Sequence, residues 1–530
     1  MTLFLEKKSF KDTGLRLIKK GQKGIVHAIF SRFGVIILLF ALQIILFFAG
    51  LIWVQSFASE FFFGGLLIGL FVSAYILNTK SDPSAKLTWV ILVMALPVFG
   101  TLLYAYTELE VGHRSLRNKV AKIAEETKEK IPQENAVFKA FEEKDPGGAS
   151  VARYLKKTGS FPVFDRTSVS YFPLGEDFFD TLLAELKKAK DFIFLEYFII
   201  DEGIMWGKIL EILAEKVKEG VDVRVMYDGT NEFTSLPRNY PELLKKLGIK
   251  CKVFAPLSPF VSTHYNYRDH RKIMVIDGNT AFTGGINFAD RYINRETVHG
   301  HWKDTAVMLK GKAVKGFTLM FLQMWNISEK EPEFEPFLSF PSLPPENAEG
   351  FVIPYGDCPL DGDKVGEMVY MDILNRAKNY VHIMTPYLIL DGEMETALRF
   401  AAERGVEVRI ILPGVPDKLA PYSLAKSHYS ALLDSGVEIF EYEPGFIHAK
   451  SFVADNCEAV VGTINLDYRS LYHHFECAAY CYETACIGDI EKDFQETLEK
   501  CRRITKKNIW KNYPLLRPLS FLMKIIAPLL

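Results

Sequence analysis

The first fifth of the chain differs from the rest in how its apolar residues are spaced. Three uncharged apolar runs lie at Phe33–Val54, Phe61–Leu77 and Leu87–Tyr106. A run of about 20 apolar residues is long enough to cross a bilayer as a helix. We therefore predict a basic leader over residues 1–32 and a transmembrane region over residues 33–107. The pattern is compatible with two or with three spans, and it leaves open which membrane face holds the remaining chain.

A highly charged segment follows over residues 108–160. Glu and Lys alternate there at helical spacing, as in EETKEKIPQEN. Such pairs stabilise an exposed helix. We interpret this segment as a solvated helical connector.

Beyond Phe161 the pattern becomes that of a globular α/β protein, and it occurs twice. Ala189–Gly229 and Ala377–Gly414 each contain an apolar strand, an amphipathic helix that ends near a Gly, and a second apolar strand. A β-α-β unit of this kind predicts parallel strands covered by helices. We therefore expect two similar halves, over residues 161–340 and 341–530.

The second half ends in an apolar segment, Trp510–Leu530, that also carries Lys and Arg. Two interpretations stay open for it. It is either a segment lying at a membrane surface or a helix docked on the globular part.

Composition excludes several classes of protein. The formal net charge is −2 and the mean hydropathy is +0.07, so the basic excess typical of a nucleic-acid-binding protein is missing. The 7 Cys are an odd number without a CxxC pair, which argues against a disulfide framework and a zinc site.

The most informative motif is His-x-Lys-x4-Asp, which occurs once in each half. The first copy is His270-x-Lys272-x4-Asp277 and the second is His448-x-Lys450-x4-Asp455. Each continues into a Gly-containing tail that ends in Asn287 or Asn465. The apolar run after each Lys is strand-like, so we expect His and Lys to alternate along a strand and to point to one face.

This set of side chains fits phosphodiester chemistry. A neutral His can attack phosphorus and form a phosphohistidine, while a second His protonates the leaving alkoxide and later deprotonates the incoming hydroxyl. Two Lys and the amides of Asn287 and Asn465 would neutralise the phosphoryl charge, with no metal ion or other cofactor. We expect Asp277 and Asp455 to brace the turn after the strand, although they belong to the motif.

At these residues the chain resembles the phospholipase D superfamily, and more closely the bacterial cardiolipin synthases. The stretches that carry the resemblance include YNYRDHRKIMVIDGNTAFTGGINFADRY, HWKDTAV and GFIHAKSFVADNCEAVVGTINLDYRS. It implies a duplicated phospholipase D-like α/β sandwich, two mixed sheets flanked by helices, preceded by N-terminal transmembrane helices. It also implies a multi-pass protein of the cell membrane that acts on phosphatidylglycerol and forms cardiolipin in the bilayer, with no obligate protein partner.

The resemblance also implies roles for individual residues. His270 would be the nucleophile and His448 the acid and base. Glu476 would orient His270, and Asp304 would orient His448, each acid coming from the other half. Another phospholipase D-type transfer stays open, with ethanolamine, another alcohol or water as acceptor. A membrane scaffold with an inactive site is the alternative from a different class.

Overall fold

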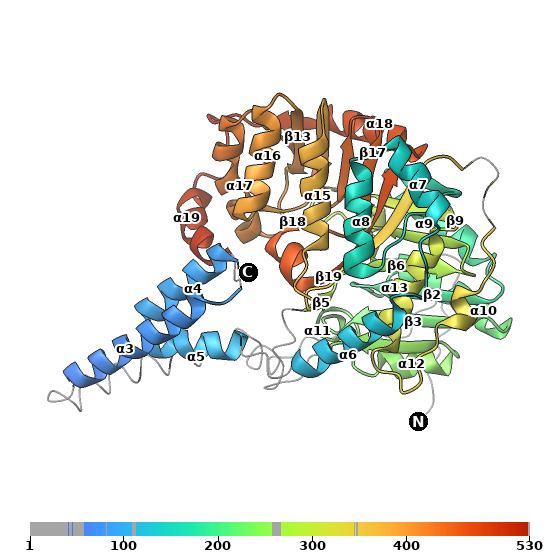
Figure 1. The fold of residues 1–530 in the computed structure, drawn as a ribbon, viewed down its shortest axis with the longest axis horizontal. Helices are drawn as coiled ribbons and strands as arrows, with labels where there is room; N and C mark the ends of the chain where they lie inside the picture. The colour runs from blue at the N-terminus through green and yellow to red at the C-terminus, as the bar shows by residue number, and fades with distance from the viewer. Residues whose placement is uncertain are drawn as a thin grey trace.

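The computed structural model describes residues 41, 45, 58–80, 82–108, 113–256, 267–343, 345 and 348–527 of the 530-residue chain. A narrow arm of three helices projects from a larger α/β body (Figure 1). These helices are α3 (Ala58–Leu77), α4 (Pro83–Ala95) and α5 (Pro97–Glu108). The second half of the chain, in orange and red, lies above the first half, in green (Figure 1).

The arm corrects one sequence-based prediction. The run Leu87–Tyr106 is not a single helix, because α4 ends at Ala95 and α5 begins at Pro97. Proline lacks the amide hydrogen that would continue the helix, and its ring clashes with the preceding turn. The predicted run Phe33–Val54 lies outside the described residues except for residues 41 and 45. Among the helices described, none is both long and apolar enough to cross a membrane.

The charged connector is helical, as predicted, but it is only partly solvated. The segment forms α6 (His113–Thr127), α7 (Asn135–Lys144) and α8 (Gly148–Gly159). Val137, Phe141 and Leu155 are buried in the core of the second half. The spacing of four residues between Val137 and Phe141 places both on one face of α7, which is why a charged helix still packs against the body.

Each half is built on a mixed sheet. The first sheet has the order β1-β9-β7-β6-β2-β3-β4. Its strands are β1 (Thr167–Phe172), β9 (Ala306–Gly311), β7 (Thr280–Gly284), β6 (Lys272–Ile276), β2 (Phe192–Tyr197), β3 (Asp222–Asp228) and β4 (Lys250–Phe254).

The second sheet has the order β10-β19-β17-β16-β11-β13-β14-β20, and β5 pairs with β19 beside this path. Its strands are β10 (Phe351–Asp357), β19 (His474–Tyr482), β17 (Glu458–Gly462), β16 (Ser451–Ala454), β11 (Tyr380–Met384), β13 (Glu407–Pro413), β14 (Glu438–Tyr442), β20 (Cys501–Arg503) and β5 (Arg268–Asp269). The first seven strands of each order correspond one to one, so the predicted duplication covers the whole sheet.

The predicted β-α-β units are present. In the first half β2 and β3 are parallel and joined through α10 (Ile204–Lys218), and in the second half β11 and β13 are parallel and joined through α16 (Gly392–Glu403). Gly220 and Gly405 follow these helices with φ of +94° and +98°, a left-handed conformation that glycine adopts without strain.

The core has three main parts. One apolar cluster lies between the two sheets and includes residues of β6, β9 and β17 together with α13 (Val314–Asn326) and α18 (Cys486–Leu498). The other two clusters lie on the outer faces of the sheets. α9 (Gly175–Leu186) and α10 cover the first sheet, while α15 (Val365–Arg376), α16 and α17 (Leu419–Asp434) cover the second.

The apolar C-terminal segment forms α19 (Leu516–Ile526). Ser520 and Ala527 are buried, and Ala527 packs in a cluster with Leu424 of α17, whereas Phe521 is 75% exposed. The segment thus contains a docked helix with an apolar side that faces outward. All 7 Cys are free thiols, in line with the expectation from their spacing.

Candidate active site

The two halves exchange short strands at the site. β5, just before His270, pairs with the start of β19 from the second half. In the same way β15 (Gly445–Ile447), just before His448, pairs with β8 (His301–Lys303) from the first half. The backbone N–H of His270 donates to the carbonyl of Phe475 at 2.9 Å, and that of His448 donates to the carbonyl of Lys303 at 2.6 Å.

This exchange corrects the expected position of the two histidines. His270 and His448 lie before β6 and β16 rather than within them. Because their backbone amides bond to the opposite half, each His is fixed at the boundary between the halves. Phe475 and Lys303 directly precede Glu476 and Asp304, so each acid is carried to the imidazole of the other half.

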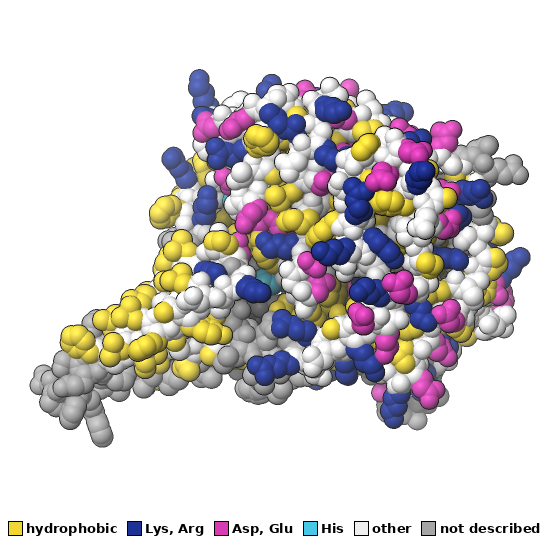
Figure 2. Space-filling model, viewed as in Figure 1, with side chains coloured by type: hydrophobic (Ala, Val, Ile, Leu, Met, Phe, Trp, Pro, Cys, Tyr) yellow, Lys and Arg dark blue, Asp and Glu magenta, His cyan; other side chains and the backbone are white. Residues whose placement is uncertain are grey.

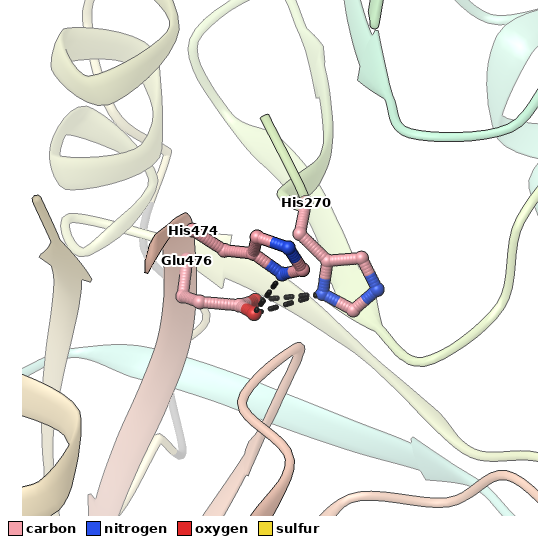
Figure 3. Close-up of side chains that lie close together, drawn as sticks. All are labelled: His270, His474 and Glu476. Carbon is pink, nitrogen blue, oxygen red and sulfur yellow. Dashed lines mark hydrogen bonds and ion pairs between the residues drawn. The ribbon is translucent and has the colours of Figure 1, made fainter. Parts of the chain in front are cut away.

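Glu476 holds the first imidazole. Its two carboxylate oxygens lie 2.9 and 3.0 Å from Nδ1 of His270 (Figure 3). Burial lowers the pKa of His270 well below its ordinary value, so the ring is neutral near pH 7. Burial acts to raise the pKa of Glu476, but the imidazoles of His270 and His474 outweigh it and bring that pKa below its ordinary range. The first dyad is therefore a carboxylate and a neutral imidazole.

Asp304 holds the second imidazole in a different electrostatic state. Its Oδ2 lies 2.6 Å from Nδ1 of His448. Burial raises the pKa of Asp304 to about 7, while burial and the charge on Lys450 lower the pKa of His448. Lys272 also lowers the pKa of His448 through its charge, which means that the two motifs act on each other electrostatically.

In both dyads the acid lies at Nδ1, and in the first dyad the ionised carboxylate of Glu476 thereby selects the tautomer. An imidazole whose Nδ1–H donates to a carboxylate keeps its lone pair on Nε2. Nε2 of His270 is thus the atom available for attack on phosphorus.

The two lysines are completely enclosed. Burial lowers the pKa of Lys272 to about 8 and that of Lys450 to about 7. Lys450 Nζ lies 2.8 Å from Nδ1 of His448. An anionic phosphodiester between these amines would favour their charged forms, because a buried ammonium group needs an opposite charge beside it.

The two asparagines differ in how they are held. Asn287 accepts a hydrogen bond from the backbone N–H of Ile199 at 3.0 Å and donates to Tyr292 at 2.8 Å. One amide hydrogen of Asn287 remains for a ligand. Asn465 donates to Asp467 at 3.3 Å, and its buried Oδ1 has no hydrogen-bond partner among the described residues. Their phosphate-binding role stays a prediction.

Asp277 and Asp455 lie at the far ends of β6 and β16, away from the imidazoles. Asp277 accepts three backbone hydrogen bonds of 2.8–2.9 Å from residues 190–192, at the start of β2. Asp455 accepts three of 2.7–2.9 Å from residues 378–380, at the start of β11. Both residues have a positive φ, +49° and +51°. They fasten a turn to the neighbouring strand in each half.

Three neighbours of the dyads are not among the site residues predicted from the sequence. The Thr463 hydroxyl donates to Glu476 Oε2, and the imidazole of His474 lies with its ring centre 5.2 Å from that of His270 (Figure 3). Trp302 is the counterpart of His474, two residues before the acid, and its ring centre lies 5.3 Å from that of His448. Aligning HWKD with HFE on their acids would have found this pair.

Gly285 corresponds to Thr463 in the first half. A Cβ at Gly285 would lie 2.0 Å from Oδ1 of Asp304, so no larger residue fits there. Glycine therefore leaves space for the acid in one half, whereas Thr463 adds a hydroxyl donor to the acid in the other half.

Comparison with known proteins agrees with this geometry. The family model described as "Cardiolipin synthase, PLD-like domain" matches residues 182–325 and 370–498, and the model "Phospholipase_D-nuclease N-terminal" matches residues 66–106. A cardiolipin synthase of Alkalihalophilus pseudofirmus is 32% identical over 87% of this chain and 92% of its own length. Cardiolipin synthase 2 of Bacillus anthracis is 32% identical over 84% of this chain and 90% of its own length.

Two further similarities extend the comparison. An uncharacterized protein of Streptococcus mutans is 53% identical over 86% of this chain and 99% of its own length. Among solved structures, phosphatidylserine synthase of Haemophilus influenzae aligns with a TM-score of 0.54 at 12% identity, covering 72% of this chain and all of that one. At this identity the alignment supports a shared fold.

Proposed function

Since the chain belongs to the cardiolipin synthase family of the phospholipase D superfamily, we propose that it is a phosphatidyltransferase that joins two phosphatidylglycerol molecules. The products are cardiolipin and glycerol. The observation that carries the proposal is the pair of crossed dyads, His270 with Glu476 and His448 with Asp304.

The first step forms a covalent intermediate. Nε2 of His270 attacks the phosphorus of one phosphatidylglycerol, and the bond from phosphorus to the headgroup glycerol breaks. The departing alkoxide takes a proton from Nε2 of His448, so that glycerol leaves as a neutral alcohol. The phosphatidyl group remains on His270.

The second step reverses the proton transfer. His448 now accepts a proton from the headgroup hydroxyl of a second phosphatidylglycerol, and that oxygen attacks phosphorus. The bond from phosphorus to His270 breaks and cardiolipin is released. One phosphodiester replaces another, so the step needs no nucleotide.

Charge stabilisation comes from the two lysines and the two asparagines. Lys272 and Lys450 are buried amines beside the dyads, and a phosphoryl group with developing charge restores their full protonation. We assign Asn287 and Asn465 to phosphoryl oxygens on the basis of their place in the motif tails.

The arm is assigned to the membrane, where both lipid substrates are dissolved. Large apolar side chains on α3–α5 are strongly exposed, among them Phe63, Leu67, Phe71 and Tyr75, and apolar side chains cover the arm in Figure 2. A continuous exposed apolar surface marks an interaction with lipid or protein. We propose that the chain is an integral protein of the cell membrane.

The test uses the purified full-length chain in detergent with phosphatidylglycerol as the only lipid. Cardiolipin and glycerol are expected in equal amounts, and neither is expected with His270→Asn. His428→Asn is the matched control, because His428 pairs with Glu395 on the outer helices. Phosphatidic acid as the main product would mean that water is the acceptor, and it would contradict the synthase assignment.

A further inference from the structure

The first dyad contains a third group that the transfer reaction does not use. His474 is 8% exposed, and its Nδ1 lies 3.6 Å from Oε1 of Glu476, the same oxygen that lies 2.9 Å from Nδ1 of His270. Figure 3 shows both imidazoles directed at one carboxylate. Each of the three residues offers one ligand atom, and these atoms lie within 4.8 Å of one another.

Two imidazoles and one carboxylate are a common ligand set for Zn²⁺, with an open fourth position. Ligand atoms around a tetrahedral Zn²⁺ are separated by about 3.3 Å, since each lies about 2.0–2.1 Å from the ion. The separations of 2.9 and 3.6 Å at Glu476 bracket this value. The buried Nδ1 of His474 also has no hydrogen-bond partner among the described residues, so a ligand bond is open to it.

We propose that His270, His474 and Glu476 bind a divalent ion such as Zn²⁺ or Co²⁺, and that this ion switches off the nucleophile. An ion bonded to Nδ1 of His270 takes the position of the ring hydrogen, which then resides on Nε2. A protonated Nε2 has no lone pair and does not attack phosphorus. The ion therefore acts as an inhibitor and has no part in the transfer.

The second half cannot form such a site. Trp302 stands where His474 stands in the first half, and indole offers no lone pair to a metal ion. Inhibition by the ion is therefore specific to His270, the residue that carries the phosphatidyl group. The inhibitory effect rests on the proposed function, whereas ion binding does not depend on it.

The test measures binding and turnover separately on the full-length chain in detergent. Titration with Co²⁺ is expected to give visible d–d bands of a four- or five-coordinate ion, with one equivalent bound and displaced by Zn²⁺. His474→Asn is expected to weaken binding at least about tenfold. His473→Asn, at the preceding position, is the matched control and is expected to leave the spectrum unchanged.

A second variant guards against misfolding as an explanation. His474→Cys replaces the imidazole by a thiolate ligand, and it is expected to retain Co²⁺ binding with an added sulfur-to-cobalt charge-transfer band. In turnover assays Zn²⁺ is expected to inhibit the wild type, and the same Zn²⁺ concentration is expected to leave the activity of His474→Asn at its metal-free level.

The outcomes separate the two proposals. Normal turnover without a Co²⁺ spectrum, or a spectrum that survives in His474→Asn, would overturn the metal site. A Co²⁺ spectrum that depends on His474 supports the site even if phosphatidylglycerol is not converted, in which case the proposed function alone fails.

Discussion

The two halves of the site share one backbone arrangement, but the pKa values of their two acids are shifted in opposite directions. In each half, a His that precedes a sheet strand receives an acid from the other half on its Nδ1. Glu476 is surrounded by two imidazoles and the Thr463 hydroxyl, and its pKa lies below the ordinary range. Asp304 faces Gly285 in place of that hydroxyl, and burial raises its pKa to about 7.

This difference assigns the two roles. Burial keeps His270 a neutral nucleophile, and a carboxylate that stays ionised beside it stabilises the positive charge of a phosphohistidine. A dyad that gains and loses a proton near neutral pH suits the group that must deliver a proton and then recover it. The duplication thus gave both halves the same His–acid arrangement, and the residues around each acid gave the two dyads different protonation states.

The largest effect is expected from removing either imidazole. A substrate whose leaving group needs no proton should distinguish the role of His270 from that of His448. His270→Asn is expected to lose about 10⁴-fold or more in turnover with any substrate. His448→Asn is expected to lose about 10²–10⁴-fold with phosphatidylglycerol. With a p-nitrophenyl phosphatidyl ester, whose leaving group needs no proton, it should still release one equivalent of nitrophenol in a rapid-mixing assay. Equal loss in both variants with this ester would remove the distinction between the halves.

The pH dependence of the first step should come from the second dyad. This dyad must hold a proton to protonate the leaving glycerol, and with the pKa of Asp304 near 7 it loses that proton above about pH 7. The rate of phosphohistidine formation should therefore fall above this pH in single-turnover assays. In Asp304→Asn the proton rests on His448 alone, whose pKa burial lowers, so the fall should begin at lower pH.

Glu476→Gln is the matched variant for that profile. It is expected to reduce the rate, because the amide stabilises a phosphohistidine less well, without moving the decline at high pH. A displaced decline in Glu476→Gln and an unchanged one in Asp304→Asn would reverse our assignment of the two dyads.

A smaller effect is expected from the hydroxyl that distinguishes the acids. Thr463→Val keeps the shape but removes the hydroxyl, which donates to Glu476 and accepts from the backbone N–H of Cys477. A hydrogen bond to a charged group contributes about 1.5–3 kcal/mol, so phosphohistidine formation should slow by roughly 10- to 100-fold. Thr283→Val, which changes a buried Thr whose hydroxyl contacts Cys477, is the control. An equal effect in both variants would mean that Thr463 acts only through packing.

The smallest effect on catalysis is expected at the motif aspartates. Asp277→Asn and Asp455→Asn each weaken three hydrogen bonds to backbone amides at a partly exposed turn. Each should lower the free energy of unfolding by about 1–3 kcal/mol, measured by thermal or chemical denaturation. The folded fraction should keep turnover within a few-fold of the wild type. A large loss of turnover at unchanged stability would give these residues a catalytic role.

Local patterns were enough to predict much of this architecture. The repeated β-α-β pattern and the paired motifs pointed to the duplicated sheets, because apolar periodicity reports strands and helices directly. The motif residues could be predicted from their spacing, and both acids from the family resemblance alone.

Other features depend on contacts that no local pattern records. The charge of α7 concealed the apolar face that packs on the second half, and the uncharged composition of Leu87–Tyr106 concealed the break at Pro97. The exchange of β5 and β15 between halves, and the positions of His474 and Trp302, arise from pairing across more than a hundred residues.

The most direct test of unequal halves is to identify which histidine carries the lipid. The wild-type chain would be mixed with isotopically labelled phosphatidylglycerol, quenched within the first turnover, digested and analysed by mass spectrometry under conditions that preserve phosphohistidine. We predict the phosphatidyl label on His270 and none on His448. Label on His448, or on both histidines equally, would contradict it.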